Sequence, residues 1–283
     1  MSLDAAALWA DARLAAELFA VAPAALGGMI LRAWPGPPRD RVCAWVRALL
    51  PEDRPLLRLP LHISEDRLLG GLALAATLRA GRVVAEKGLL AQADGGAVLA
   101  AMAERLELQV TSNLCAALDR GELSLERDGI TAAFPCRLGV VALDEGLADE
   151  RVPEALRDRL ALYLDFSALP PRATPEASGA FVDGGADPDV GRVAAARALF
   201  DQVTIDDDAV EALCQAALAL GVDSLRAPIL AAAAARAHAA LHGRARVEDD
   251  DAMIAARLVL GPRATRVPEP EEPEEKEDSD QGE

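Results

Sequence analysis

The chain has 283 residues, of which 52% are hydrophobic and 3% aromatic, and its formal net charge at pH 7 is −17. This length is sufficient for a sizeable core and for two domains. Apolar residues that are mostly Ala and Leu favour a helix-rich α/β or all-α protein over a β-sandwich. The acidic balance argues against non-specific nucleic-acid binding, because a phosphate backbone repels a negative surface.

Helical and apolar patterns alternate through the first hundred residues. We expect a helix from Ser2 to about Pro23, where proline interrupts the pattern. The elements that follow are a strand at 29–31, helices at 39–50 and 72–79, and strands at 56–61 and 97–101. This succession of strand, loop and helix predicts an α/β domain with a parallel sheet.

The stretch between the first strand and its helix stands where a nucleotide-binding ATPase has its phosphate loop, with the pattern G-x-x-x-x-G-K-[ST]. Here Ala33 and Pro38 replace the two glycines, Arg39 replaces the lysine, and Asp40 replaces the hydroxyl residue. Pro37 and Pro38 lack the backbone N–H groups that cradle phosphate, and Asp40 adds a negative charge. By itself the stretch is a Pro-rich turn, but its context indicates an eroded phosphate loop.

A second ATPase position also lacks its usual residues. The strand at 97–101 is followed by Met102, so that Ala101 and Met102 stand where working ATPases carry an Asp-Glu pair that holds magnesium and activates water. A long helix is expected at 103–119, and alternation about Asp128-Gly129 predicts a β-hairpin at 122–133. The core then continues with a strand at 138–142, a short helix at 153–159 and a strand at 160–166.

Composition changes after residue 166. Residues 167–188 are rich in Pro, Gly, Ala and Asp and are interpreted as a linker. Acidic runs stand at the starts of two later helices and are interpreted as caps that suit the helix dipole, not as metal sites. The remaining helices are expected at 189–200, 206–220, 224–242 and 247–260.

Four segments therefore divide the chain. An α/β core at 1–166 is followed by the linker at 167–188 and by a helical lid at 189–262. The last segment, 263–283, is rich in Pro and acids, and we expect it to be disordered because it cannot bury enough apolar surface.

The chain offers few metal-ligating side chains. His238 and His242 have the i, i+4 spacing that can hold a metal ion, but the sequence shows no third ligand beside them. We therefore predict a histidine pair on a helix surface and no metal site. The cysteines lack C-x-x-C spacing, which is typical of reduced core thiols in a cytosolic protein; they are Cys43, Cys115, Cys136 and Cys214.

Membrane insertion and export are not expected. The first residues lack the basic and apolar regions of a signal peptide. The Ala-rich stretch at 230–241 contains Arg236 and is too short to span a membrane. We therefore expect a cytoplasmic protein.

The order of these elements resembles an AAA+ ATPase module, and five local segments narrow the resemblance. Together they are similar to the AAA+ subunits of magnesium chelatase, and among these to the D subunits, over about residues 10–265. The segments are DRLLGG at 66–71, GLLAQADGG at 88–96, ERDGI at 126–130, ALRDRL at 155–160 and GVDSLR at 221–226.

The resemblance implies a fold and a role. The fold would be a parallel sheet flanked by helices, with hairpin insertions and an all-α lid. Magnesium chelatase inserts Mg²⁺ into protoporphyrin IX with ATP hydrolysis, in the pathway to chlorophyll and bacteriochlorophyll. Its I subunit is the ATPase motor, its H subunit binds the porphyrin, and D is a platform between them. This chain would then be a non-hydrolysing platform in an oligomeric ring. ATP and Mg²⁺ would be used by the complex, with no cofactor firmly bound by this chain.

The resemblance also assigns three arginines. Arg159 stands at the family's arginine finger, which reaches the γ-phosphate of a neighbouring subunit. Arg226 matches the lid arginine that senses nucleotide, and Arg39 keeps a cation at the eroded phosphate loop. Arg157 or Arg151 could be the finger instead, since the register is open here. The sensor position at 143–145 lacks the family's Asn-Pro.

Two other functions remain open. The chain could be a divergent ATPase with an unusual nucleotide pocket, in which Arg39 still meets a phosphate. It could also be an AAA+ adaptor of another metal-insertion or chaperone system. The prolines, Asp40, Ala101 and Met102 favour the non-hydrolysing platform over the ATPase.

Overall fold

The computed structural model describes residues 5–127, 130–147, 149–180 and 187–266. Its centre is a five-stranded sheet in the order β2-β5-β8-β1-β9, in which every neighbouring pair is parallel. The prediction of a parallel sheet is confirmed. The strands are β1 (Gly28–Arg32), β2 (Leu56–Leu59), β5 (Ala97–Ala100), β8 (Gly139–Asp144) and β9 (Leu162–Asp165).

Strand β1 lies between β8 and β9 and is buried along its whole length. Its side chains alternate between the two faces of the sheet, as the pleat of a strand requires. Met29 and Leu31 join the hydrophobic cluster on one face, whereas Ile30 joins the cluster on the other. Continuous apolar runs such as this one are typical of a parallel sheet that is covered on both faces.

Helices cover both faces. On the first face, α1 (Ala5–Val21) packs on α3 (Pro37–Leu49), and Trp9 meets Trp45 and Phe166 edge to face at ring distances of 5.7 and 5.0 Å. The second face is covered by short helices and one longer one, namely α6 (Leu89–Gln92), α7 (Leu108–Arg120) and α8 (Glu154–Arg157). The predicted helix at 103–119 is wrong at its start, because Ala103–Arg105 form a separate 3₁₀ turn.

The Pro-rich stretch is not a free turn. Helix α3 begins at Pro37, so both prolines lie in its first turn, where a missing N–H costs no helical hydrogen bond. A short helix, α2 (Pro23–Leu26), begins with proline in the same way. The predicted start of the helix at residue 39 is therefore two residues late.

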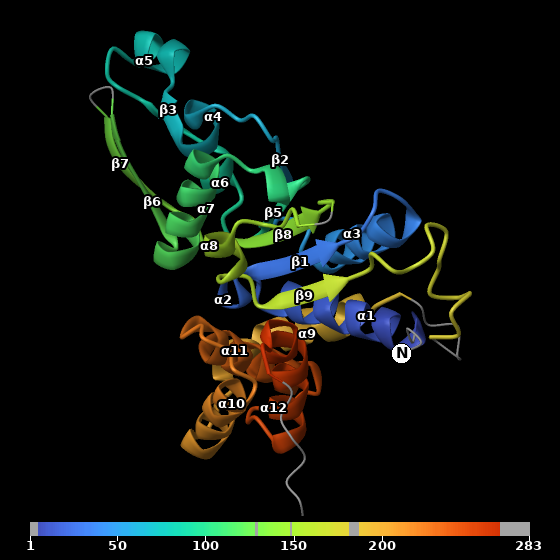
Figure 1. Ribbon diagram of the computed structural model, residues 1–283. Helices are drawn as coiled ribbons and strands as arrows, with labels where there is room; N and C mark the ends of the chain where they lie inside the picture. The colour runs from blue at the N-terminus through green and yellow to red at the C-terminus, as the bar shows by residue number, and fades with distance from the viewer. Residues whose placement is uncertain (1–4, 128–129, 148, 181–186, 267–283) are drawn as a thin grey trace, which may run out of the picture.

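Two β-hairpins extend from one end of the sheet, on the side away from the lid (Figure 1). The predicted hairpin is present as β6 (Glu122–Arg127) and β7 (Ile130–Pro135), with its tip outside the described residues. The sequence patterns missed the other hairpin. It pairs β3 (Gly70–Leu72), which follows α4 (Glu65–Leu69), with β4 (Ala85–Lys87), and α5 (Leu74–Ala80) lies between the two strands in the chain.

The lid consists of helices below the sheet in Figure 1. They are α9 (Val190–Leu199), α10 (Asp207–Ala219), α11 (Arg226–Leu241) and α12 (Asp249–Ala255), which continues as a π-helix at Ala256–Leu260. Helices α9 and α11 pack against α1, so the lid shares one hydrophobic cluster with the first face of the sheet. The four predicted helices are confirmed.

The acidic runs act as caps, as predicted. Asp206 accepts a hydrogen bond from the backbone of Ala209, and Glu248 forms a capping box with Asp251.

The predicted linker is described up to residue 180 and from residue 187, and within it Glu176 pairs with Arg41 of α3. Most of the tail, for which disorder was predicted, lies outside the described residues. In the part of the chain that the structure describes, no helix could span a membrane.

Candidate functional site

A cavity of 450 Å³ lies at the carboxyl edge of the sheet, where β5 and β8 end beside α3. Parallel α/β sheets bind their ligands at this edge. The last two residues of the eroded phosphate loop, Arg39 and Asp40, line this cavity together with Ala101 and Met102, which stand at the position of the missing Asp-Glu pair. The cavity is lined by Arg39, Asp40, Cys43, Arg47, Arg58, Leu99, Ala101, Met102, Leu143 and Glu145.

Arg39 is already paired with acids of its own chain. Its Nη1 donates to Oε1 of Glu145 at 2.8 Å, and its Nε and Nη2 donate to Oδ1 of Asp40 at 3.2 and 3.1 Å. The side chains of Arg39 and Glu145 are 19% and 17% exposed, so this contact is partly shielded from water. A phosphate group would have to displace Glu145 and approach Asp40 to reach the guanidinium.

Glu145 is held in place by a buried acid that the sequence analysis did not single out. Oε2 of Glu104 accepts the backbone N–H of Glu145 at 3.1 Å, and the Glu104 side chain is fully buried. Its Oε1 has no hydrogen-bond partner among the described residues, although Nε of Arg105 lies 3.5 Å away. In the sequence, Glu104 is an acid shortly after the buried strand at 97–101, which is a signal for a functional residue. It was missed because residues 103–119 were predicted to be one long helix.

Met102 has a left-handed backbone, with φ 51° and ψ 48°, and is the only non-glycine residue with positive φ in the described part of the chain. This conformation costs a non-glycine residue about 1 kcal/mol or more, and such residues cluster at functional sites. Neither Met102 nor Ala101 offers the oxygen ligand that Mg²⁺ requires. The residues at this edge therefore do not fit the magnesium and phosphate positions of a working ATPase.

A buried ion pair joins the ends of β1 and β8 near this cavity. Nη1 of Arg32 lies 2.8 Å from Oδ2 of Asp144, and the two side chains are 10% and 1% exposed. Arg32 also donates to the carbonyls of Gly146 and Glu150, while Oδ1 of Asp144 accepts the N–H of Gly146. This pair fixes the loop after β8, at the sensor position. An arginine at the end of an apolar strand was the only sequence signal for it.

The other two predicted arginines meet at the opposite, amino edge of the sheet. Arg159 binds Asp119 with two hydrogen bonds, from Nε to Oδ1 at 2.9 Å and from Nη2 to Oδ2 at 2.6 Å. Nη1 of Arg226 lies 3.0 Å from Oδ1 of the same Asp119. They line a cavity of 190 Å³ with Gly27, which precedes β1. A Cβ at Gly27 would lie 2.0 Å from the Arg159 carbonyl oxygen, so only glycine permits this close approach.

The hydrogen bonds from Arg159 stabilise the ionised carboxylate, so they lower the pKa of Asp119 below its ordinary value. The same contact raises the pKa of Arg159. The network also crosses from lid to core, because Nε of Arg226 lies 3.3 Å from Oδ2 of Asp158, and Ser224 donates to Oδ1 of that acid. Near the end of the lid, half-buried Arg263 donates to the carbonyls of Leu160 and Ala161, and desolvation of its guanidinium lowers its pKa to about 10.

The structure thus brings Arg159 and Arg226 together and places Arg39 in a different cavity. Of the alternative fingers, Arg157 pairs with Glu154 one turn away, at 3.0 Å. Arg151 donates to the carbonyl of Glu150 at 2.7 Å. Which arginine acts as a finger stays a prediction.

The two histidines predicted to lie on a helix surface, and the four cysteines predicted to lie in the core, are only partly where the sequence analysis expected them. His242 is exposed, but His238 is buried and contacts buried Asp251, because α11 is covered by α12 at this point. Burial raises the pKa of Cys43 to about 11 and that of Cys136 to about 12, as suits inert thiols. Cys214, by contrast, is exposed on α10.

Comparisons with known proteins agree with this fold. Residues 210–282 match the AAA lid domain family. A candidate ATPase of Cytophaga hutchinsonii has a similar structure, with a TM-score of 0.61 at 17% identity over 88% of this chain and 81% of that one. These likenesses, with the five-stranded parallel sheet and the helical lid, define a protein of the AAA+ class.

Two relatives indicate which members of this class the chain resembles. The magnesium-chelatase 60 kDa subunit of Cereibacter sphaeroides is 42% identical over 270 residues, which is 94% of this chain and 43% of that subunit. The magnesium-chelatase 38 kDa subunit of the same organism is 28% identical, over 76% of this chain and 68% of its own length. The chain is thus similar, along nearly its whole length, to the larger magnesium-chelatase subunits. It spans less than half the length of those relatives.

Proposed function

We propose that this chain is the non-hydrolysing AAA+ platform of a magnesium chelatase. It would assemble with the ATPase I subunit and the porphyrin-binding H subunit, and the complex would use ATP to insert Mg²⁺ into protoporphyrin IX. One observation carries the proposal: Arg39, the remaining cation of the phosphate loop, is held by Glu145 and Asp40 of the same chain.

Hydrolysis requires groups that this edge does not offer. Phosphoryl transfer depends on a bound magnesium ion, on a cation free to meet the phosphates, and on a group that positions the attacking water. Ala101 and Met102 stand at the positions of the two acids, and two positions of the loop are prolines without N–H groups. ATP and Mg²⁺ are therefore assigned to the partner ATPase.

Arg159 is proposed to act on a neighbouring subunit. It lies at the amino edge of the sheet, whereas the chain's own eroded pocket lies at the carboxyl edge. An arginine placed away from its own pocket can reach only the nucleotide of another subunit, as in a ring. Its planar fork, now bound to Asp119 through two hydrogen bonds, suits the oxygens of a γ-phosphate equally well.

Arg226 is proposed to couple the lid to this finger, because both guanidinium groups contact the same Asp119. In a homo-oligomeric or mixed ring, a lid movement would change the competition of the two arginines for that carboxylate. Assembly and chelation are expected in the cytoplasm.

Reconstitution tests the proposal. A full-length subunit containing this chain is purified, and ATP hydrolysis is measured with and without the I subunit. Magnesium insertion is then followed by porphyrin fluorescence after the H subunit is added. The expected result is no hydrolysis above background by the subunit alone, and chelation only when all three subunits are present. Turnover by the subunit alone that survives Arg39→Ala, or full chelation without the subunit, would contradict the platform.

A nucleotide-binding role without turnover is the second candidate. Three arginines and two acids line the 450 Å³ cavity, whose volume lies in the range of small-molecule sites. Equilibrium dialysis with ADP and ATP separates the two functions: saturable binding that is lost in Arg39→Ala would favour a bound, unhydrolysed nucleotide. A divergent ATPase would in addition show turnover.

A further inference from the structure

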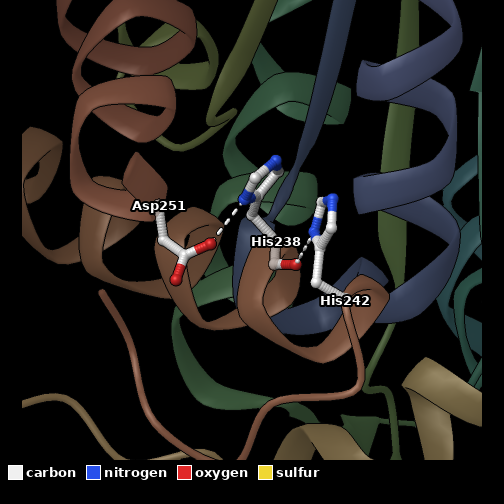
Figure 2. A group of neighbouring side chains, drawn as sticks. All are labelled: His238, His242 and Asp251. Atoms are coloured by element: carbon white, nitrogen blue, oxygen red, sulfur yellow. Dashed lines mark hydrogen bonds and ion pairs between the residues drawn. The ribbon is translucent and has the colours of Figure 1, made fainter. Parts of the chain in front are cut away.

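His238, His242 and Asp251 form a cluster in the lid, between the end of α11 and the start of α12 (Figure 2). One ligand atom of each lies within 4.8 Å of the others. The two imidazole rings are 4.4 Å apart between centroids and tilted by 45°. Neither the eroded pocket nor the arginine network includes these residues.

Asp251 fixes the orientation and tautomer of His238. Nδ1 of His238 lies 2.5 Å from Oδ1 of Asp251, whose side chain is fully buried. Asp251 also accepts hydrogen bonds from Nη2 of Arg244 at 2.7 Å and from the backbone N–H of Glu248 at 2.8 Å. Its carboxylate therefore acts only as an acceptor in all of these contacts. Nδ1 of His238 must then carry the proton, which leaves a lone pair on Nε2.

His242 is held in the same tautomer by the backbone. Its Nδ1 lies 2.9 Å from the carbonyl oxygen of His238, which can only accept a hydrogen bond. Neither Nε2 atom has a hydrogen-bond partner among the residues that the structure describes. Figure 2 shows both Nε2 atoms on the same side of the cluster, away from the Asp251 carboxylate.

This arrangement is the one that metal-ligating histidines adopt, since they donate the other ring N–H to a carboxylate or a backbone carbonyl. We propose that the Nε2 atoms of His238 and His242 bind a first-row transition-metal ion such as Zn²⁺, with Asp251 as an outer carboxylate and water as the remaining ligands. Imidazole suits Zn²⁺, Cu²⁺ and Ni²⁺, whereas Mg²⁺ prefers oxygen. The site therefore selects against the metal ion that the proposed complex inserts.

Charge and access are compatible with such an ion. Arg244 is a neighbouring cation, but it is paired with both Asp251 and Glu248. His242 is exposed and opens the site to solvent. With two protein ligands, the ion would be exchangeable, unlike the four-ligand zinc of a structural site.

Calorimetric titration of the chain without a polyhistidine tag tests the site, with ZnCl₂ and MgCl₂ as the probes. One Zn²⁺ per chain is expected, with no matching Mg²⁺ binding. His242→Ala, a change at an exposed position, should abolish the Zn²⁺ signal, and Asp251→Asn should weaken it by about 10- to 100-fold. The control is His62→Ala, because His62 is exposed and contacts Glu107 of the α/β domain, outside the lid.

Two further measurements keep the test decisive. Co²⁺ should give visible absorption bands in the wild type and in His62→Ala but not in His242→Ala, and circular dichroism shows whether each variant is folded. If Zn²⁺ were bound by the acidic residues of the tail and not by the histidines, the calorimetric signal would be the same in every variant, which would contradict the proposal. Equal Zn²⁺ affinity in folded His242→Ala, or no Zn²⁺ uptake by the wild type, would overturn the proposal.

Discussion

The two edges of the parallel sheet use arginine in similar ways but with different surroundings. At the carboxyl edge, Arg39 is 19% exposed and is bound by acids at the ends of neighbouring core elements. At the amino edge, Arg159 is 18% exposed and is bound by Asp119, a contact that it shares with Arg226 of the lid. The contacts of Arg39 lie within the α/β domain, whereas the contacts of Arg159 and Arg226 join the α/β domain to the lid.

This difference indicates how a ring subunit can lose one function and keep another. An ATPase needs its carboxyl edge for its own nucleotide and its amino edge for the neighbour's. In the proposed platform, Pro37, Pro38 and Asp40 would remove the first role and leave the second, because the two edges are separated by the length of the strands. The predictions below test whether the two edges are independent.

Arg159→Ala should give the largest effect. A trans finger is worth about a thousandfold in rate, or about 4 kcal/mol, so chelatase activity of the rebuilt complex should fall by up to that factor. Losing the bidentate pair with Asp119 should cost at most about 1 kcal/mol of folding stability. Chelation is measured alongside melting curves. Arg157→Ala tests the alternative finger in the same assay and should leave activity unchanged if Arg159 is the finger, and Asp119→Asn shows how much of any loss comes from the pair alone. Full activity of folded Arg159→Ala would leave the arginine a structural role only.

Asp144→Ala should be the most damaging change at the carboxyl edge. It leaves Arg32 charged and buried without its partner, which costs about 3 kcal/mol. Denaturant unfolding measures the loss. Arg32→Met combined with Asp144→Leu should recover part of it, although the carbonyls of Gly146 and Glu150 lose their donor. A loss below about 1 kcal/mol in the single variant would show that water reaches the pair.

Glu145→Gln should reopen the eroded loop in part. It removes the charge that holds Arg39, and a hydrogen bond to a charged group is worth about 1.5 kcal/mol or more, so affinity for pyrophosphate should rise about tenfold. Equilibrium dialysis is the measurement, and Glu86→Gln on the distant β-hairpin is the control. If affinity stays unchanged, Asp40 and the prolines exclude phosphate by themselves.

Asp119→Asn should give the smallest effect, and only as a function of pH. Since Arg159 lowers the pKa of Asp119 below 3.8, the carboxylate stabilises the fold above that pH and loses its contribution as the pH falls through the lowered pKa. The difference in melting temperature between wild type and variant should be constant from pH 7 to about pH 5 and should close below pH 3.8. A difference that persists at lower pH would assign the effect to shape instead of charge.

Much of the fold followed from local patterns. The strand of Met29–Leu31, the hairpin after α7 and the four lid helices were predictable because apolar periodicity and turn residues act over a few neighbouring residues. The eroded loop was also readable, since a proline lacks its N–H in any context. The hairpin of β3 and β4 was not predictable, because its strands are three residues long and are defined only by their pairing.

The sequence by itself determined the AAA+ order of elements and the loss of the phosphate-loop residues, because both depend on which side chains follow one another. Only the tertiary structure decided what those residues contact. Arg39 meets Glu145 across 106 positions, Arg32 meets Asp144 across 112, and Arg159 shares Asp119 with a lid arginine. Asp251 of α12 likewise meets His238 of the preceding helix. Such pairs form where packing brings distant chain segments within a few ångströms, and no local pattern encodes that distance.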